Sequence, residues 1–169
     1  MDKTVFIING GAKVGKDTIV SMVKKMCNTR NIDSVAVIKN VAIQLGWDGT
    51  KTEKNRLFLS ELKRLADNHF NHSTKYISNQ LKLFIDSEDV LSFVHIREPQ
   101  MIDKAKELCS INNIKCYTMI VTNPNIPQIT TNQSDKNVFN YKYDMHICND
   151  GTLEDLRYEV ETIIGGYLV

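Results

Sequence analysis

The chain has 169 residues, of which 42% are hydrophobic and 24% are charged, so it is long enough for one domain with a buried core. A formal net charge of +1 excludes a strong overall attraction to nucleic acid polymers or to anionic membrane surfaces. No apolar run approaches the ~20 residues of a membrane span, and the charged start of the chain leads directly into an apolar segment, so we expect neither a membrane anchor nor a signal peptide.

The first predicted element is a strand over residues 3–9, centred on the apolar run Val-Phe-Ile-Ile. A glycine-rich loop follows over residues 10–18, with the sequence Gly-Gly-Ala-Lys-Val-Gly-Lys-Asp-Thr. Apolar residues at helical spacing then predict a helix over about residues 15–28. A strand, a glycine loop and a helix in this order are the context that a phosphate-binding loop requires.

The chemistry of this loop suits a nucleoside triphosphate. Glycines let successive backbone N–H groups point inward at an anion, and the following helix adds the positive end of its dipole. Lys16 supplies a mobile positive charge for the β- and γ-phosphates, whereas Asp17 stands where a serine or threonine is usual and the hydroxyl moves to Thr18. The predicted nucleotide-binding residues are Gly10, Gly11, Ala12, Lys13, Val14, Gly15, Lys16, Asp17 and Thr18.

A second strand is predicted over residues 34–38, where an unbroken apolar run is typical of a buried parallel sheet. The strand pattern then stops until residue 90, and two helices are predicted over about residues 52–71 and 73–86. On the first of these helices an apolar face carries Phe58, Leu62, Leu65 and His69. The opposite, polar face carries Arg56, Ser60, Lys63 and Asp67.

Two interpretations of this polar face remain open. Charged helical faces are usually solvated, and for Asp67 we adopt that interpretation. Arg56 and Lys63, however, lie two turns apart on one stripe of an insertion that follows a strand, so they are also candidates for a second anion site.

A third strand over residues 90–96 ends in His-Ile-Arg-Glu-Pro, and Pro99 is a favourable start for a helix that runs to about residue 112. Ligands of open parallel sheets gather beyond the carboxyl ends of the strands, so Arg97 and Glu98 should lie on the same rim as the glycine loop. Arginine can hold a phosphoryl group bidentately. His95 lies inside the apolar strand and is interpreted as a core residue outside the site.

The rest of the chain continues this alternation. A fourth strand is predicted over residues 116–121 and a fifth over 144–149, followed by a helix that Thr152 and Asp155 cap and that buries Leu153, Leu156, Val160, Ile163 and Ile164. Between them, residues 122–137 have no periodicity and form either a closing flap or an ordinary surface loop. The pattern predicts an α/β domain with helices on both faces of the sheet.

Four cysteines are scattered among apolar neighbours without the spacing of metal ligands: Cys27, Cys109, Cys116 and Cys148. We expect buried, reduced thiols and a cytoplasmic location.

Three segments resemble a known family: Gly-Lys-Asp-Thr at 15–18, Ile-Arg-Glu-Pro at 96–99, and residues 143–156. Together they resemble the P-loop nucleoside monophosphate kinase superfamily, most closely the deoxynucleoside monophosphate kinases of phages and bacteria. Phosphomevalonate kinases and dephospho-coenzyme A kinases are more distant resemblances. The resemblance implies the P-loop NTPase three-layer fold, with a five-stranded parallel sheet of order 2-3-1-4-5, an acceptor-binding helical insertion and a lid.

In these terms the chain is one kinase domain. Its core comprises residues 1–39, 89–121 and 138–169, with the insertion at about 40–88 and the lid at about 122–137. Two features depart from the family. The lid contains no arginine, and His95 stands where many relatives have an aspartate. Since phosphoryl transfer depends on charge neutralisation, these departures weaken the case for catalysis more than the case for binding.

The activity implied is ATP-dependent phosphoryl transfer to a small phosphorylated acceptor, a (deoxy)nucleoside monophosphate. ATP and Mg²⁺ are the implied cofactors, with Asp17 as the metal ligand. Lys13, Lys16 and Arg97 are the implied catalytic residues. The implied acceptor-binding residues are Arg56, Lys63, Arg97 and Glu98.

Other functions remain open at this stage. The chain could be a nucleotide-binding switch or regulatory ATPase, although it lacks the Asn-Lys-x-Asp motif with which GTPases recognise guanine. It could also be a catalytically weak member that binds a partner protein, or a kinase of another small metabolite. A homodimer is one of the oligomeric states left open.

Overall fold

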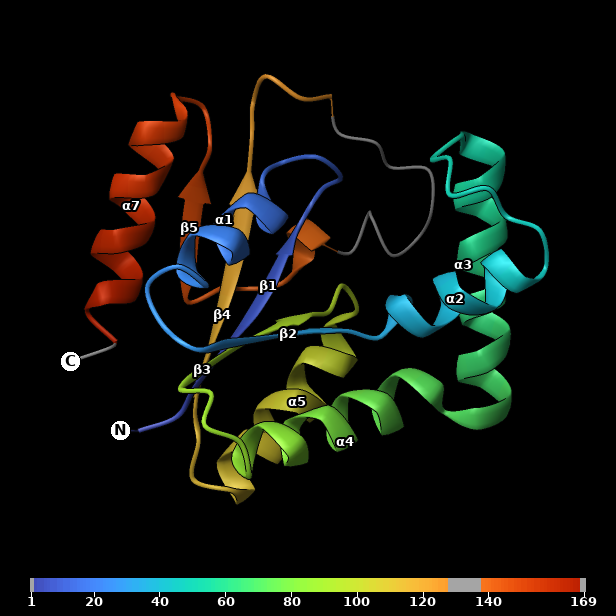
Figure 1. The fold of residues 1–169 in the computed structure, drawn as a ribbon, viewed down its shortest axis with the longest axis horizontal. Coiled ribbons are helices and arrows are strands. Elements are labelled where there is room, and N and C mark those ends of the chain that lie inside the picture. The colour runs from blue at the N-terminus through green and yellow to red at the C-terminus, as the bar shows by residue number, and fades with distance from the viewer. Residues whose placement is uncertain (1, 128–137, 168–169) are drawn as a thin grey trace.

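The structure is a computed structural model that describes residues 2–127 and 138–167. Its centre is a parallel sheet of order β2-β3-β1-β4-β5, the order that the family resemblance implies (Figure 1). The strands are β1 (Thr4–Gly10), β2 (Thr29–Asp33), β3 (Leu91–His95), β4 (Lys115–Thr122) and β5 (Met145–Cys148). The helical elements are α1 (Lys16–Val23), α2 (Val35–Gln44), α3 (Glu53–Phe70), α4 (His72–Ile85), α5 (Pro99–Ile111), the 3₁₀ turn η1 (Val138–Asn140) and α7 (Leu153–Gly165).

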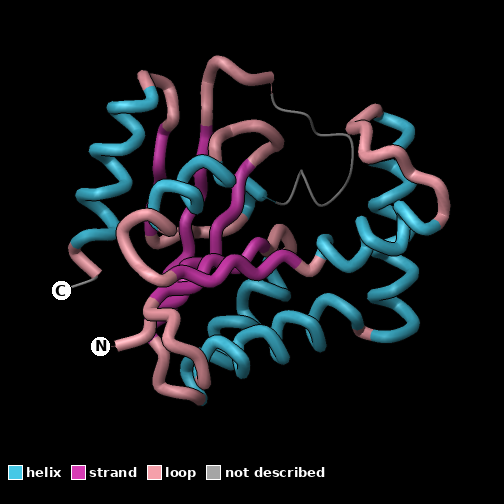
Figure 2. The backbone as a smooth tube through the Cα atoms, viewed as in Figure 1, coloured by secondary structure: helices cyan, strands magenta, loops and turns pink. Residues whose placement is uncertain are grey.

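β1 occupies the middle of the sheet and every one of its residues is buried. Successive side chains of a strand point to opposite faces, so Phe6 and Ile8 pack with α1 and α7 in one hydrophobic cluster. Val5 and Ile7 pack with α4 and α5 in a second cluster on the other face. The result is the expected three-layer α/β arrangement, which Figure 2 shows as a sheet with helices on both sides. In the described residues, no helix is long and apolar enough to cross a membrane.

The prediction of a second strand over residues 34–38 is wrong, because the strand precedes this run and the run itself lies in α2. β2 is an edge strand that pairs only with β3, so it tolerates polar side chains such as Arg30 and Asn31. The carboxylate of Asp33 then accepts a hydrogen bond from the backbone N–H of Val35 at 2.9 Å as the chain turns into the helix. α2 buries Ile38 and Ala42, which are four residues apart on one helical face.

The helices α2, α3 and α4 form the insertion, and α3 stands at the far side of the molecule from α7 (Figure 1). The predicted apolar face of α3 is turned outward: Phe58 is 36% exposed and Leu65 is 46% exposed. Its predicted polar face instead points inward, because α3 packs on α2 and α4 beside a cavity lined by charged side chains rather than on the sheet. Helical periodicity therefore divided the residues of α3 between two faces correctly, but the expectation that the apolar face is the buried one is wrong.

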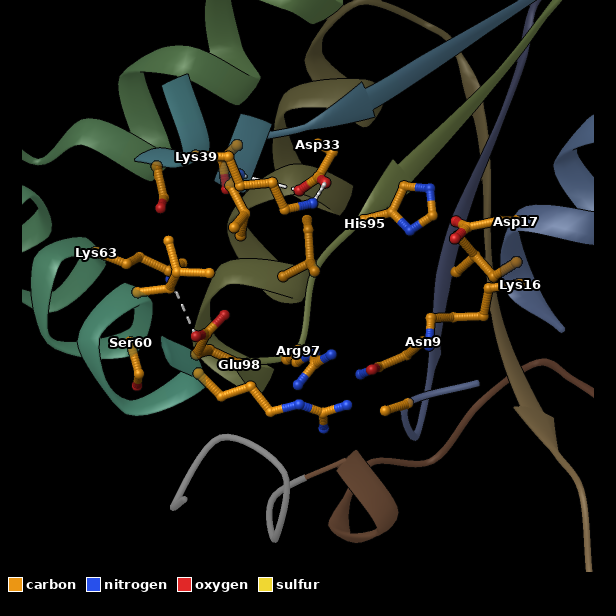
Figure 3. Close-up of a pocket in the computed structure, with 18 of the residues that line it drawn as sticks. Asn9, Lys16, Asp17, Asp33, Lys39, Ser60, Lys63, His95, Arg97 and Glu98 are labelled. Atoms are coloured by element: carbon orange, nitrogen blue, oxygen red, sulfur yellow. Dashed lines mark hydrogen bonds and ion pairs between the residues drawn. The ribbon is translucent and has the colours of Figure 1, made fainter. Parts of the chain in front are cut away.

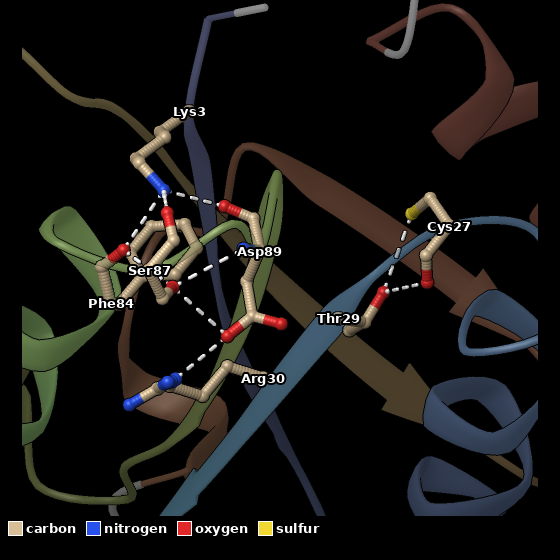
Figure 4. Close-up of polar contacts among 7 residues, drawn as sticks. All are labelled: Lys3, Cys27, Thr29, Arg30, Phe84, Ser87 and Asp89. Atoms are coloured by element: carbon tan, nitrogen blue, oxygen red, sulfur yellow. Dashed lines mark hydrogen bonds and ion pairs between the residues drawn. The ribbon is translucent and has the colours of Figure 1, made fainter.

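The start of β1 is attached to the turn between α4 and β3 by Lys3 (Figure 4). Its ammonium group donates to the backbone carbonyls of Phe84 at 2.9 Å, Ser87 at 2.7 Å and Asp89 at 2.6 Å. The same group lies 4.7 Å from the centre of the Phe84 ring, at a distance typical of a cation–π contact.

Smaller differences from the sequence-based expectations concern the end of α1 and the start of α7. α1 ends at Val23, before the predicted residue 28, since the chain must turn into β2 at Thr29. In α7 the predicted capping box of Thr152 and Asp155 is present, whereas Leu153 is 67% exposed at the outer side of the first turn.

The four cysteines are free thiols, but they are not all buried. Cys109 is buried and Cys27 and Cys116 are half-buried, whereas Cys148 is exposed at the end of the edge strand β5, so the expectation is wrong for this residue. The predicted lid at 122–137 lies outside the described residues from residue 128 onward.

Candidate functional site

The glycine loop between β1 and α1 has the backbone conformation of an anion-binding loop. Gly10, Lys13 and Gly15 have φ angles of 140°, 65° and 109°. A Cβ atom at Gly10 would collide with the carbonyl oxygen of Val121, and one at Gly15 would collide with the side chain of Asn149. Only glycine fits these two positions. Alternation of right-handed and left-handed backbone conformations turns consecutive N–H groups toward one concave surface.

Neighbouring strands hold this loop in place. The amide nitrogen of Asn149 donates to the carbonyl of Val14 at 3.0 Å, from the segment that follows β5. At the other end of the loop, the side-chain oxygen of buried Asn9 accepts from the N–H of Gly10 at 2.8 Å. The Asn9 amide in turn donates to the hydroxyl of Tyr143 at 2.7 Å. The loop is therefore preorganised by contacts from the segments on either side of β5.

Lys16 folds back over the loop to which it belongs. Its ammonium group donates to the carbonyl of Gly10 at 2.8 Å and to that of Gly11 at 2.5 Å. This geometry keeps the charge at the loop's mouth, where a short side-chain rotation would bring it to a bound phosphate.

A cavity of about 340 Å³ opens in front of the loop (Figure 3). It is bounded by the loop and α1 on one side, by the ends of β2 and β3 at its base, and by α2, α3 and α4 on the other side. Among the predicted site residues, its lining includes Ala12, Lys13, Lys16, Asp17, Arg56, Lys63, Arg97 and Glu98. The other predicted nucleotide-binding residues are not in the described lining: Gly10, Gly11, Val14 and Gly15, which lie at the end of β1 and in the loop, and Thr18, which lies in α1.

Positive charge is concentrated in this cavity. The described lining contains seven lysine and arginine side chains and three carboxylates, although the whole chain has a formal charge of only +1. The cations that the sequence interpretation did not include are Lys39 of α2 and Lys51, which precedes α3. A concave surface with excess charge of one sign concentrates ligands of the opposite sign, so the cavity is suited to anions.

Lys63 connects α3 to the start of α5. Its ammonium group lies 3.0 Å from a carboxylate oxygen of Asp67 and 3.1 Å from one of Glu98. Burial alone would lower the pKa of Lys63, but the two carboxylates outweigh it and the pKa lies above its ordinary value. Lys63 is therefore a charged member of the cavity wall that already has two anionic neighbours (Figure 3).

Asp67 is not the solvated side chain that the sequence interpretation assigned. One carboxylate oxygen accepts from the backbone N–H of Ser73 at 2.7 Å, and the other accepts from the Ser73 hydroxyl at 3.1 Å. Burial would raise the pKa of Asp67, but the hydrogen bonds from Ser73 and the contact with Lys63 keep it below its ordinary value. Asp67 thus caps the first turn of α4 and orients Lys63.

Arg56 and Arg97 approach the cavity from different sides. Arg56 lies near the N-terminus of α3, where its Nε atom donates to the carbonyl of Lys51 at 3.3 Å. Arg97 follows β3, and in Figure 3 its side chain points toward that of Asn9, in front of the loop. Arg56 thus comes from the insertion and Arg97 from the end of β3, and both line the cavity.

His95, which the sequence interpretation left outside the site, ends β3 and lines the cavity. Its Nε2 atom is hydrogen-bonded to the side-chain oxygen of Asn31 at 2.7 Å. Burial lowers the pKa of His95 even though Asp33 and Asp17 act to raise it, so the ring is held neutral at neutral pH. The rule that site residues follow the carboxyl ends of strands would have identified it.

Asp33 is a second missed residue, and it faces His95 in the register of β2 and β3. It lies 3.6 Å from the ammonium group of Lys39. Because the sequence interpretation placed the second strand after it, Asp33 was not recognised as a strand-end residue.

The carboxylates suit a magnesium ion that arrives with a nucleotide. The described residues contain no cluster of three or more His, Cys, Asp or Glu side chains that could hold a metal. Mg²⁺ is, however, usually held by one or two carboxylates together with phosphates and waters. Asp17 and Asp33 both line the cavity and provide that number.

Comparisons with known proteins concern the fold. No family model and no curated protein sequence matches the chain. Among solved structures, it is similar to the APS kinase of Mycobacterium tuberculosis in complex with AMPPNP and APS, with 9% identity, a TM-score of 0.52, and 97% of this chain and 98% of that one covered. It is also similar to the shikimate kinase of Aquifex aeolicus, with 10% identity, a TM-score of 0.57, and 98% and 99% coverage.

A third similar structure is the tunicamycin resistance protein of Deinococcus radiodurans, with 10% identity, a TM-score of 0.57, and 96% of each chain covered. The similarity covers nearly the whole of each chain. At such low identities it establishes the architecture only, and the chain accordingly has the three-layer α/β fold of P-loop kinases.

Proposed function

We propose that this protein transfers the γ-phosphoryl group of ATP to a small phosphorylated acceptor, a (deoxy)nucleoside monophosphate, and releases ADP and the diphosphate. The observation that supports this most directly is that one cavity joins the phosphate loop to a cationic insertion. A site of this kind accommodates two anions, one at each end.

The donor end is the loop. The inward-facing backbone N–H groups and the ammonium group of Lys16 bind the β- and γ-phosphates, and Lys13 lies beside the group being transferred. Asp17 would hold Mg²⁺, and Asp33, which is paired with Lys39, is a second carboxylate of the same cavity. When bound, Mg²⁺ neutralises charge on the phosphate oxygens during transfer.

The acceptor end lies between α2 and α3. Arg56, Lys51 and Lys39 provide positive charge there, and Lys63 contributes through its network with Asp67 and Glu98. A phosphate oxygen of the acceptor attacks the γ-phosphorus, and the bond to the β–γ bridging oxygen breaks. Since the attacking oxygen is already anionic, no proton has to be removed and no general base is required.

Arg97 is placed to contact both the donor and the acceptor. It lies at the carboxyl end of β3, between the loop and the insertion, where the transferred group would pass. A guanidinium group can bind two phosphoryl oxygens at once, and its contact strengthens as charge shifts in the transition state.

The test is an acceptor screen that follows ADP release in a coupled assay. The panel consists of ribo- and deoxyribonucleoside monophosphates, phosphorylated metabolites without a base, and neutral alcohols. We expect ADP release to depend on one or more nucleoside monophosphates and to form their diphosphates. Lys25→Ala, at an exposed position beyond α1, is the control for effects of charge alone.

Other outcomes identify other functions. ADP release at the same rate with and without every acceptor would indicate a regulatory ATPase. ATP binding without turnover would indicate a binding protein. Preference for a neutral alcohol would overturn the phosphorylated acceptor and would require a carboxylate such as Asp33 as a base.

A further inference from the structure

Trp47 lies in the loop between α2 and α3, and its side chain turns toward the cavity. From residue 43 to residue 54, all of which the structure describes, Trp47 is half-buried and every other residue is exposed. It lines the cavity together with Thr50 and Lys51 of the same loop. A loop that exposes all its other side chains therefore directs one large aromatic ring inward.

The hydrophobic core does not account for this burial. Neither of the two hydrophobic clusters in the described part of the chain includes Trp47. Within the same residues, no ring contact joins Trp47 to another aromatic side chain. Trp47 is also the only tryptophan in the chain. Its indole thus adds an aromatic surface to a cavity whose lining contains both charged and aliphatic side chains.

The loop fixes the orientation of the ring. The indole N–H donates to the carbonyl of Thr50 at 2.9 Å, so the polar edge of the ring is already satisfied. Thr50 is itself held by Asp48, whose carboxylate accepts from its N–H at 2.9 Å and from its hydroxyl at 2.6 Å. Asn55 of α3 donates to the Thr50 hydroxyl at 2.8 Å. What the ring offers a ligand is therefore its apolar surface, in an orientation that is set before binding.

Cations line the same cavity as this ring. Lys51 lines it four residues after Trp47, and Arg56 donates to the backbone carbonyl of Lys51. A cavity that offers both an apolar ring and positive charges matches a ligand with a planar, uncharged part and an anionic part. In Figure 1 the loop between α2 and α3 is well separated from α1, which follows the phosphate loop. The loop that carries Trp47 thus belongs to the insertion side of the cavity.

We infer that Trp47 stacks on the nucleobase of the acceptor and is the residue that selects acceptors carrying a base over other small phosphates. This inference rests on the proposed function, because it assigns the insertion end of the cavity to the acceptor. Stacking tolerates every base, since each base has a π face, so Trp47 distinguishes nucleotides from other phosphates rather than one base from another.

The first test uses the fluorescence of Trp47, which reports on this position alone. We expect saturable quenching when nucleoside monophosphates are titrated in the presence of AMPPNP, and none with ribose 5-phosphate. Quenching by AMPPNP alone, with no further change on adding any monophosphate, would overturn the assignment to the acceptor. This test needs no turnover, so it can succeed even if the proposed phosphoryl transfer fails.

The second test is kinetic. Trp47→Leu should raise the KM for nucleoside monophosphates about five- to a hundred-fold while leaving kcat and the donor KM close to wild type. Trp47→Phe should restore most of the loss, because it retains an aromatic face. Phe70→Leu changes an exposed aromatic residue at the end of α3, outside the described cavity lining, and is the matched control.

Unchanged acceptor KM in a folded Trp47→Leu variant would overturn the stacking role while leaving phosphoryl transfer intact. Equal KM increases for nucleoside monophosphates and base-free phosphates would also overturn it, since they would show that Trp47 only supports the loop. Thermal denaturation of both Trp47 variants establishes that each is folded under the assay conditions.

Discussion

Lys16 must exchange contacts if it is to bind the phosphates of ATP as proposed. Its hydrogen bonds to the carbonyls of Gly10 and Gly11 have to be exchanged for contacts with phosphate oxygens. Lys16→Ala should leave the fold intact and weaken ATP binding by about ten- to a hundred-fold, because a charge-assisted hydrogen bond contributes ~1.5–3 kcal/mol. Isothermal titration calorimetry measures this, with Lys25→Ala as the control. Unchanged affinity in the folded variant would contradict the loop assignment.

Arg56 and Arg97 should affect different kinetic constants. Arg56→Ala should raise the acceptor KM about ten- to a hundred-fold and leave donor affinity nearly unchanged, because it removes a contact made before the reaction. Arg97→Ala should mainly lower kcat, since its contact strengthens in the transition state. Steady-state kinetics over the monophosphate panel separates the two effects. If Arg56→Ala behaves as wild type, this part of α3 is merely solvated.

Lys63→Ala should combine a kinetic effect with a structural one. It removes the cation that lies between Asp67 and Glu98 and leaves two carboxylates facing each other across the gap. We therefore expect both a raised acceptor KM and a lower Tm, unlike Arg56→Ala. A KM effect without any change in Tm would mean that the ion pairs contribute nothing to the fold.

At this scale, local sequence was sufficient to predict the loop residues but not their partners. The spacing of glycines around Lys16 follows from backbone geometry within a few residues, so it is readable from sequence. Lys39 and Trp47 join the cavity only because α2 and the loop after it fold back toward the glycine loop, whereas Asp33 does so because it ends β2 beside His95 of β3. The residues next to them in the sequence give no indication that they lie at the cavity.

Among the secondary-structure elements, the junction of α3 and α4 depends on one carboxylate. Asp67→Asn should lower the Tm by about 2–8 °C, since the amide accepts hydrogen bonds less strongly and loses the attraction of Lys63. The pKa of Asp67 lies below its ordinary value of 3.8 in the folded chain, so its stabilising effect is present above that value and is lost as the pH falls through the folded pKa.

The measurement is the Tm of wild type and Asp67→Asn over a series of pH values from neutral to acid. The difference between them should be largest at neutral pH and should shrink below about pH 4. Glu61→Gln, at an exposed position of the same helix, should show a much smaller difference. A difference that stays constant down to acid pH would show that Asp67 acts by packing and not by charge.

The elements also show where sequence periodicity is insufficient. The apolar run at 34–38 fits a buried strand or a helix equally well, and the polar segment before it is a strand only because β3 pairs with it. In α3 the two faces were correctly separated, but which face points inward depends on the cavity. The order of the strands, in contrast, followed from the family resemblance and is confirmed.

For the molecule as a whole, charge is distributed unevenly between the cavity and the remaining surface. Screening should therefore reduce the encounter with anionic substrates, and kcat/KM should fall about ten-fold or more between low salt and about 0.5 M KCl. Lys51→Met should give a shallower dependence on ionic strength, because it removes one cation from the cavity. A rate that does not change with salt would contradict electrostatic attraction as the reason for the excess cations.

The central position of β1 has a consequence for folding during translation. β1 is synthesised well before the strands that flank it: Thr4 pairs with Leu91 of β3 on one side and with Lys115 of β4 on the other. A nascent chain that ends before β3 leaves both edges of an apolar strand unpaired, and such edges promote aggregation. Both edges of β1 can therefore be paired only after most of the chain has been translated. We expect slow, late folding as a result of this strand order.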